Sequence, residues 1–162
     1  MPPPQTDVTP QRPATTDTSP MDGLAQLLAM KEAGLKAPII EKMGFELVQI
    51  ERGLAVFEGV PDQSVYNPLG TVHGGYAATM LDSACGIAVH SQITATQSYT
   101  TLELKVAYHR AMTNKSGKVR AEGRVMSMGR RAAFAEGKLF DEQGRLCASA
   151  TSTLLVFDRP RQ

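Results

Sequence analysis

The stretch "NPLGTVHGGYAATMLDSACGIAVH", residues 67–90, decides the fold prediction, because a glycine-rich turn leads into a long and almost wholly apolar helix. Only three side chains between residues 76 and 89 are polar, and one of them is the carboxylate of Asp82. A helix so apolar is expected to be buried. Its polar side chains fall on one stripe of a helical wheel together with two glycines and a histidine: Gly75, Thr79, Asp82, Ser83, Gly86 and His90.

Two interpretations of this stripe stay open from the residues alone. It is either a solvent-facing surface on which Asp82 is simply hydrated, or the wall of a crevice. Gly86 favours the crevice, because a glycine inside a helix costs about 1 kcal/mol relative to alanine, and the approach of a ligand or another chain would compensate that cost. The stripe also lacks the Lys, Glu and Arg side chains that usually cover an exposed helix.

The turn that precedes the helix supplies glycines at Gly70, Gly74 and Gly75. The first amides of a helix lack internal acceptors and favour negative charge. A glycine there lets a substrate oxygen approach the backbone, so such an amide can stabilise the oxyanion that forms when a carbonyl is attacked. A tight strand-to-helix turn without any ligand is the alternative.

On both sides of this helix the hydrophobic pattern has period two, which indicates strands joined by short turns. Such strands form an antiparallel sheet, so we expect an α+β domain with one helix packed on a curved sheet. The expected elements are a helix over 21–34, a helical turn over 38–43, a hairpin over 44–60, the long helix, and strands near 99–109, 119–125, 131–140 and 146–157.

Composition fits one domain over residues 21–162, preceded by a tail over residues 1–20 that holds six of the ten prolines and is expected to be disordered. The net charge of +1 gives no support for nucleic-acid or membrane binding. No secretory signal or membrane-length apolar run is visible, and the two cysteines lie far apart, so we expect a cytoplasmic protein without a metal site.

The segment "NPLGTVHGGYAATMLDSACGIA" resembles the Asn…His-Gly-Gly…Asp/Glu signature of hotdog-fold acyl-CoA thioesterases, closest to the PaaI-like branch named for phenylacetic acid degradation. The resemblance covers roughly residues 35–157, and the element order also fits. It implies a hotdog fold, in which the curved sheet wraps one long central helix. It also implies hydrolysis of an acyl-CoA or aryl-CoA thioester to the free acid and CoA, with no cofactor because CoA is part of the substrate.

The resemblance further implies roles for individual residues. Asp82 would act as general base or nucleophile while the Gly74 amide polarises the thioester carbonyl. Asn67 would position the thioester or water, and His73 would shape the same corner. A hydroxyl residue at the start of the third strand would orient the water, and Thr101 is preferred over Thr100 because it takes the phase opposite Leu102 and Leu104. Ser83 lacks a positioned histidine, which disfavours a serine nucleophile.

For the CoA phosphates the resemblance points to Gly129, Arg130 and Arg131, with plain solvation of the turn as the alternative. Weaker candidates are Arg110, Lys115 and Lys118. The resemblance also implies a homodimer whose sites combine Asp82 of one copy with residues 67–74 of the other, often paired further into a dimer of dimers.

Other functions stay open at this point. One is a hotdog protein that binds acyl-CoA without hydrolysing it, as a sensor or carrier, and a lower-ranked one is a dehydratase or hydratase. The acyl group is also open. Tyr66, Tyr76 and Met80 suit either an aromatic or medium-chain pocket or the core.

Overall fold

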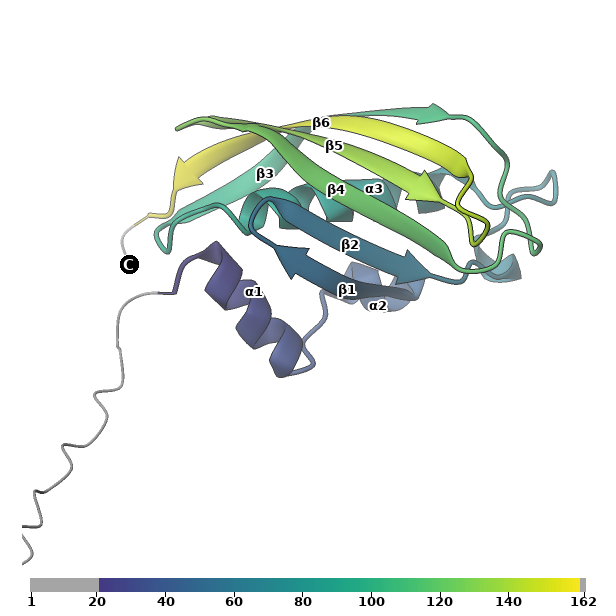
Figure 1. Ribbon diagram of the computed structural model, residues 1–162, viewed down its shortest axis with the longest axis horizontal. Helices are drawn as coiled ribbons and strands as arrows, with labels where there is room; N and C mark the ends of the chain where they lie inside the picture. Colours follow the sequence, from purple (N-terminus) through teal and green to yellow (C-terminus); the bar gives the residue numbers. More distant parts are fainter. Residues whose placement is uncertain (1–20, 161–162) are drawn as a thin grey trace, which may run out of the picture.

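The computed structural model describes residues 21–160, so the expected tail over residues 1–20 lies outside the described part. Six strands form one antiparallel sheet in the order β1-β2-β4-β5-β6-β3, which curves around α3 (Figure 1). The elements are α1 (Gly23–Glu32), α2 (Pro38–Met43), β1 (Phe45–Glu51), β2 (Leu54–Gly59), a 3-10 turn η1 (Gln63–Val65), α3 (Gly74–His90), β3 (Gln97–Tyr108), β4 (Val119–Met128), β5 (Ala132–Phe140) and β6 (Leu146–Asp158).

These elements confirm the predicted order and place every predicted helix and strand within a few residues of its expected bounds. Strict alternation in the sequence located the strands because one face of the sheet covers α3 and is buried while the other faces outward. None of the helices in the described part is long and apolar enough to cross a membrane.

Helix α3 lies against the concave face of the sheet and buries most of its side chains there. The closest approach is at Gly123 in β4, where a Cβ atom would collide with the backbone of Ala84. Tyr76, Met80 and Leu81 are almost fully buried in this interface, in contact with the inward side chains of the strands. The sheet therefore needs a glycine at this point to hold the helix that carries Asp82.

Strand β3 forms one edge of the sheet and contains a bulge that changes which side chains face inward. Thr101 pairs with Leu154 and Glu103 with Thr153, so Leu102 is left over and is 62% exposed. A bulge shifts the alternation by one residue. Tyr99 and Thr101 before the bulge consequently face α3, as do Leu104 and Val106 after it.

The N-terminal segment lies beside β1 and the outer side of α3 (Figure 1). Asp22 caps α1 by accepting a hydrogen bond from the Ala25 amide at 3.0 Å, and it pairs with Arg52 at 2.8 Å. The Gly23 amide bonds to the Ile93 carbonyl at 3.0 Å, which ties the start of α1 to the loop after α3. This attachment places the rest of α1 over the polar stripe.

Candidate active site

The carboxylate of Asp82 lies half-buried in the middle of α3, and among residues 21–160 it accepts one hydrogen bond, from the Thr101 hydroxyl at 3.0 Å. The structure thus selects Thr101 rather than Thr100, whose side chain is exposed on the other face of β3. The reason for which Thr101 was preferred over Thr100 is wrong. Thr101 does not take the phase opposite Leu104; because of the bulge at Leu102, both face inward.

Asp82 lines a cavity of about 420 Å³ that separates α3 from the N-terminal segment. Ser83, Gly86 and Thr101 line it as well, so part of the polar stripe borders a crevice rather than open solvent. The chain's own α1, the following loop and α2 form the opposite wall. Much of the wall of the crevice is therefore supplied by the same chain.

Gly86 has an explanation within the chain that the sequence did not reveal. A Cβ atom there would lie 3.3 Å from the ring of Tyr99, which also borders the cavity. The close approach inferred from the cost of this glycine is real, but the approaching group is this ring rather than a ligand or another chain.

Tyr99 is the main residue of the site that was not singled out from the sequence. Burial, together with the nearby charge of Asp82, raises the pKa of Tyr99 to about 12, so its hydroxyl stays protonated at neutral pH. The hydroxyl makes no hydrogen bond to another residue of the 21–160 range. Its position two residues before Thr101, on the same strand face, is the signal that could have identified it.

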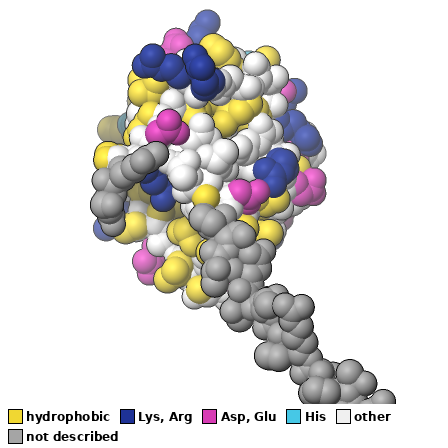
Figure 2. Space-filling view, turned by 90° about the vertical axis from the view of Figure 1, so that its left-hand side faces the viewer, with side chains coloured by type: hydrophobic (Ala, Val, Ile, Leu, Met, Phe, Trp, Pro, Cys, Tyr) yellow, Lys and Arg dark blue, Asp and Glu magenta, His cyan; other side chains and the backbone are white. Residues whose placement is uncertain are grey.

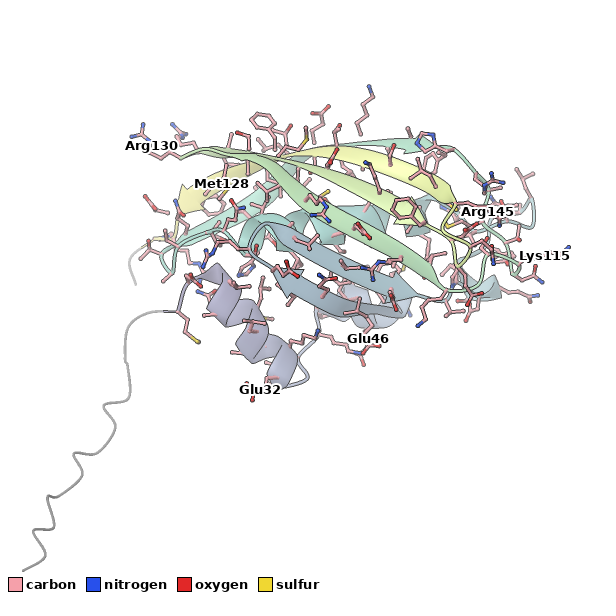
Figure 3. The ribbon with its side chains drawn as sticks, viewed as in Figure 1. Glu32, Glu46, Lys115, Met128, Arg130 and Arg145 are labelled. Atoms are coloured by element: carbon pink, nitrogen blue, oxygen red, sulfur yellow. The ribbon has the colours of Figure 1, made fainter. Side chains whose placement is uncertain are left out.

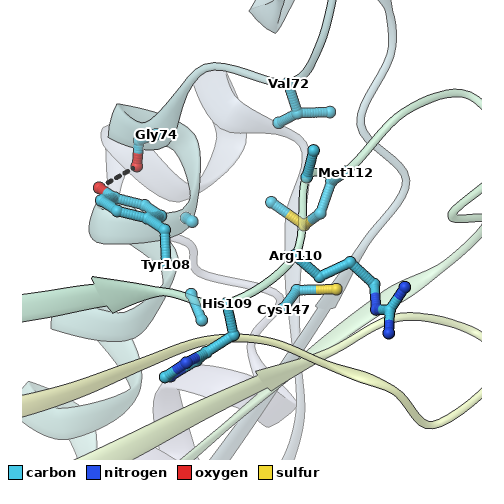
Figure 4. A pocket seen from close by; sticks show the side chains of 10 residues that line it. Val72, Gly74, Tyr108, His109, Arg110, Met112 and Cys147 are labelled. Atoms are coloured by element: carbon cyan, nitrogen blue, oxygen red, sulfur yellow. Dashed lines mark hydrogen bonds between the residues drawn. The ribbon is translucent and has the colours of Figure 1, made fainter.

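The entry to α3 forms a separate corner. The His73 side chain caps the helix, with Nδ1 accepting a hydrogen bond from the Gly75 amide at 2.8 Å. The Tyr108 hydroxyl donates to the Gly74 carbonyl at 2.9 Å, and both residues line an open cavity of about 330 Å³ (Figure 4). The Gly74 amide has no acceptor among the described residues, so it is available to an oxygen from outside.

Asn67 holds the loop before this corner. Its Oδ1 accepts hydrogen bonds from the Leu69 and Thr71 amides at 3.0 and 3.2 Å, and its Nδ2 donates to the Thr71 hydroxyl at 2.9 Å. Within one chain the side chain therefore shapes the turn that presents Gly74, and one Nδ2 hydrogen is left for another partner.

One copy of the chain does not bring Asp82 and Gly74 to the same carbonyl group. They are eight residues apart on one helix, which corresponds to about 12 Å along its axis. The free amide at the start of a helix also points along the axis away from later turns. A single thioester carbonyl that contacted the Gly74 amide and the Asp82 carboxylate at about 3 Å each would not span this distance.

The predicted CoA-binding residues lie at the tip of the β4–β5 hairpin. Figure 3 shows Arg130 at this tip, at the opposite end of the sheet from Lys115, and Figure 2 shows basic side chains gathered at the upper edge of the same end. The Gly129 amide donates to the Ala132 carbonyl at 2.8 Å and closes the turn. Arg130 and Arg131 are exposed and make no ion pair within the described part, whereas Lys118 is paired with Glu58 at 3.2 Å.

The side-chain positions bear on three alternatives raised by the sequence: a serine nucleophile, an acyl pocket lined by aromatic residues, and a metal site. The Ser83 hydroxyl donates to the Thr79 carbonyl at 2.8 Å and has no histidine beside it, which argues against a serine nucleophile. Tyr76 and Met80 are core residues and Tyr66 packs against the same core, so none of the three lines the cavity at Asp82. Between residues 21 and 160 no three His, Cys, Asp or Glu side chains cluster as a metal site.

Comparison with known proteins agrees with this fold. The model of the thioesterase superfamily matches residues 69–148. The proofreading thioesterase EntH of Klebsiella pneumoniae is 30% identical over 122 residues, 75% of this chain and 88% of that protein. The 1,4-dihydroxy-2-naphthoyl-CoA hydrolase of Listeria monocytogenes is 28% identical over 72% of this chain and 93% of its own length.

Among solved structures, a mutant of the phenylacetic acid degradation protein PaaI of Thermus thermophilus aligns with a TM-score of 0.67 and 26% identity. The alignment covers 74% of this chain and 98% of that one. The curved sheet around one helix is thus a hotdog fold of the kind found in thioesterases. The chain belongs to the thioesterase superfamily, in its PaaI-like part, and is a thioester hydrolase.

Proposed function

We propose that the chain hydrolyses acyl-CoA thioesters, with Asp82 as the catalytic carboxylate. The observation that carries the proposal is the Asp82–Thr101 hydrogen bond of 3.0 Å at the wall of a cavity large enough for an acyl group. A relative whose name specifies a CoA ester, the Listeria monocytogenes hydrolase, supports CoA as the thiol.

In the proposed reaction Asp82 removes a proton from water while the water oxygen bonds to the thioester carbon. The carbonyl oxygen becomes an oxyanion that the Gly74 amide stabilises, and the thiolate of CoA then leaves and takes up a proton. In the alternative route, Asp82 itself attacks the thioester carbon, which forms a mixed anhydride and releases CoA. Water then hydrolyses the anhydride to the free acid. Thr101 fixes the orientation of the carboxylate in either route.

We place each complete site between two copies of the chain, because Asp82 and Gly74 of one chain do not reach the same carbonyl. Strand β3 ends the sheet with an open edge of 12 residues, and such long edges are normally covered by another strand. Pairing β3 with β3 of a second copy would extend the sheet and cover this edge. Residues 67–74, including His73, would then approach Asp82 of the partner, and two such dimers would form the tetramer.

Replacement of Asp82 by Asn tests the catalytic role. The change keeps the shape and the possible hydrogen bond from Thr101 but removes the base, so we expect kcat to fall at least about 100-fold, the lower range for loss of a general base. Release of the CoA thiol, followed with a thiol-reactive dye over a panel of acyl- and aryl-CoA esters, measures the rate. If D82N hydrolyses them within a few-fold of wild type, the mechanism is wrong. Tight binding of CoA esters by the wild type without turnover would instead favour a carrier or sensor.

Mixing two inactive variants tests the shared site. Gly74→Pro removes the amide hydrogen at the first helical position, where the fixed φ of proline fits, and the extended backbone of His73 suits a following proline. Its Cβ would lie 3.0 Å from the Tyr108 ring, so the unfolding midpoint of G74P is measured beside its activity. Randomly mixed dimers of G74P and D82N would hold one intact site in every mixed pair, so about a quarter of wild-type activity should return. A mixture that stays as inactive as its components would place both groups in one chain.

A further inference from the structure

We infer that the cavity beside Asp82 holds the acyl group of the substrate, and that residues 27–40 select an uncharged, apolar acyl group of medium size. The inference rests on the proposed function, because it takes Asp82 as the group that acts on the thioester. It adds the substrate class and the part of the chain that determines it.

The wall opposite Asp82 is made by the N-terminal segment and is mostly apolar, with Lys31 and Lys36 as its charged members. Its apolar members come from α1, the loop after it and α2: Leu27, Met30, Leu35, Ile39 and Ile40. Leu35 and Ile39 are 62% and 50% exposed, so they stand at the mouth, whereas Leu27 and Ile40 are buried further in. This wall lies outside residues 69–148, the part that matches the thioesterase family model and carries Asp82.

Most polar groups around the cavity already have partners within the chain, so they are poor partners for a charged acyl group. Lys31 donates to the Val48 carbonyl at 2.8 Å, and Lys36 is 3.9 Å from Glu46 at the exposed rim. The Ser83 hydroxyl bonds to its own helix backbone. The Tyr99 hydroxyl makes no hydrogen bond to another of residues 21–160, but it lies over Gly86, one turn from Asp82, and so belongs to the reacting end.

The size of the cavity limits the acyl group. At about 30 Å³ for each water-sized group, a volume of 420 Å³ holds about fourteen such groups when full. Because the cavity is open at its mouth, we expect an acyl group of about eight to twelve non-hydrogen atoms. A linear chain and an aryl-alkyl group of this size are both compatible with the lining.

Met30 and Leu28 provide a matched test, since both lie on α1 with similar exposure, 41% and 49%, but only Met30 lines the cavity. The substrate panel holds straight-chain esters from acetyl- to hexadecanoyl-CoA, together with benzoyl-, phenylacetyl- and succinyl-CoA. For the wild type, kcat/KM should be highest for the apolar acyl groups of medium size. Met30→Trp should lower kcat/KM for the ten- and twelve-carbon esters about tenfold or more and leave the shortest ester within about threefold, because each excluded methylene is worth about tenfold or more. Leu28→Trp should leave the whole profile unchanged.

The outcomes separate this inference from the proposed function. A wild type that hydrolyses none of the esters would overturn the proposed function itself. A wild type that depends on Asp82 but shows the same chain-length profile in M30W as in L28W would overturn only the inference. Equal loss for short and long esters in M30W, or a preference for succinyl- over butanoyl-CoA, would overturn it as well. A shift of the optimum to shorter groups in M30W, and to longer ones in Met30→Ala, would support it.

Discussion

Replacing Thr101 by Val should damage catalysis while leaving the fold intact. The change exchanges the hydroxyl for a methyl group of similar size, so the packing of β3 against α3 is kept. It removes the 3.0 Å bond to Asp82, and the carboxylate accepts no other hydrogen bond from residues 21–160. A hydrogen bond to a charged group contributes about 1.5–3 kcal/mol. If that free energy holds Asp82 in its reactive orientation, kcat should fall about 10- to 100-fold, since 1.4 kcal/mol corresponds to a factor of about ten.

The assay is the release of CoA from the best ester of the panel, with the thermal unfolding midpoint measured in parallel. Thr100→Val is the matched control, because Thr100 is exposed on the other face of the same strand and should keep wild-type kcat. Thr101→Ser restores the hydroxyl and should recover most of the rate. The reasoning would be refuted by full activity in T101V, by an equal loss in T100V, or by a T101S variant as slow as T101V.

Three further predictions concern CoA binding and stability. Arg130→Ala with Arg131→Ala should raise KM for CoA esters several-fold with little change in kcat, and should not affect a short thioester without the nucleotide, such as an N-acetylcysteamine ester. Asp141→Asn should destabilise the β5–β6 turn by about 1–3 kcal/mol in urea unfolding, because this buried carboxylate accepts three hydrogen bonds. Burial would raise the pKa of Asp141, but its bonds from Arg145 lower it overall, so this stabilisation should be present at neutral pH and lost as pH falls through the lowered pKa. Gly123→Ala should cost about 1–3 kcal/mol or more, because its Cβ would collide with the Ala84 backbone; unchanged stability would contradict that contact.

The sequence allowed the helices and strands to be located and Asp82 to be chosen as the candidate acid, because the patterns that indicate them are local. Period-two alternation located the strands, and the polar stripe on an apolar helix singled out Asp82. The bulge at Leu102 could not be predicted, because it depends on how β3 pairs with β6. Strict alternation without the bulge would place Thr101 on the outer face of the sheet. The Tyr99 ring over Gly86 and the apolar wall over residues 27–40 were missed for a similar reason. Both come from segments distant in sequence whose local patterns suit an ordinary strand and an ordinary amphipathic helix.

The cavity is lined by α3 and β3 on one side and by the N-terminal segment on the other. This arrangement explains how the otherwise apolar helix α3 can carry the carboxylate of Asp82. Asp82 and Thr101 are held by α3 and β3, whose packing is fixed by the core of the sheet, and Ser83 and Gly86 line the cavity beside them. The opposite wall is attached to that core mainly through the start of α1 and the side of β1. Changes at exposed wall positions such as Met30 should therefore alter which acyl group fits without disturbing the carboxylate, because they touch neither the helix–sheet interface nor the Thr101 bond. A loss of global stability in M30A as large as that expected for a core truncation, about 2–5 kcal/mol, would show that the wall is part of the core and would remove this separation.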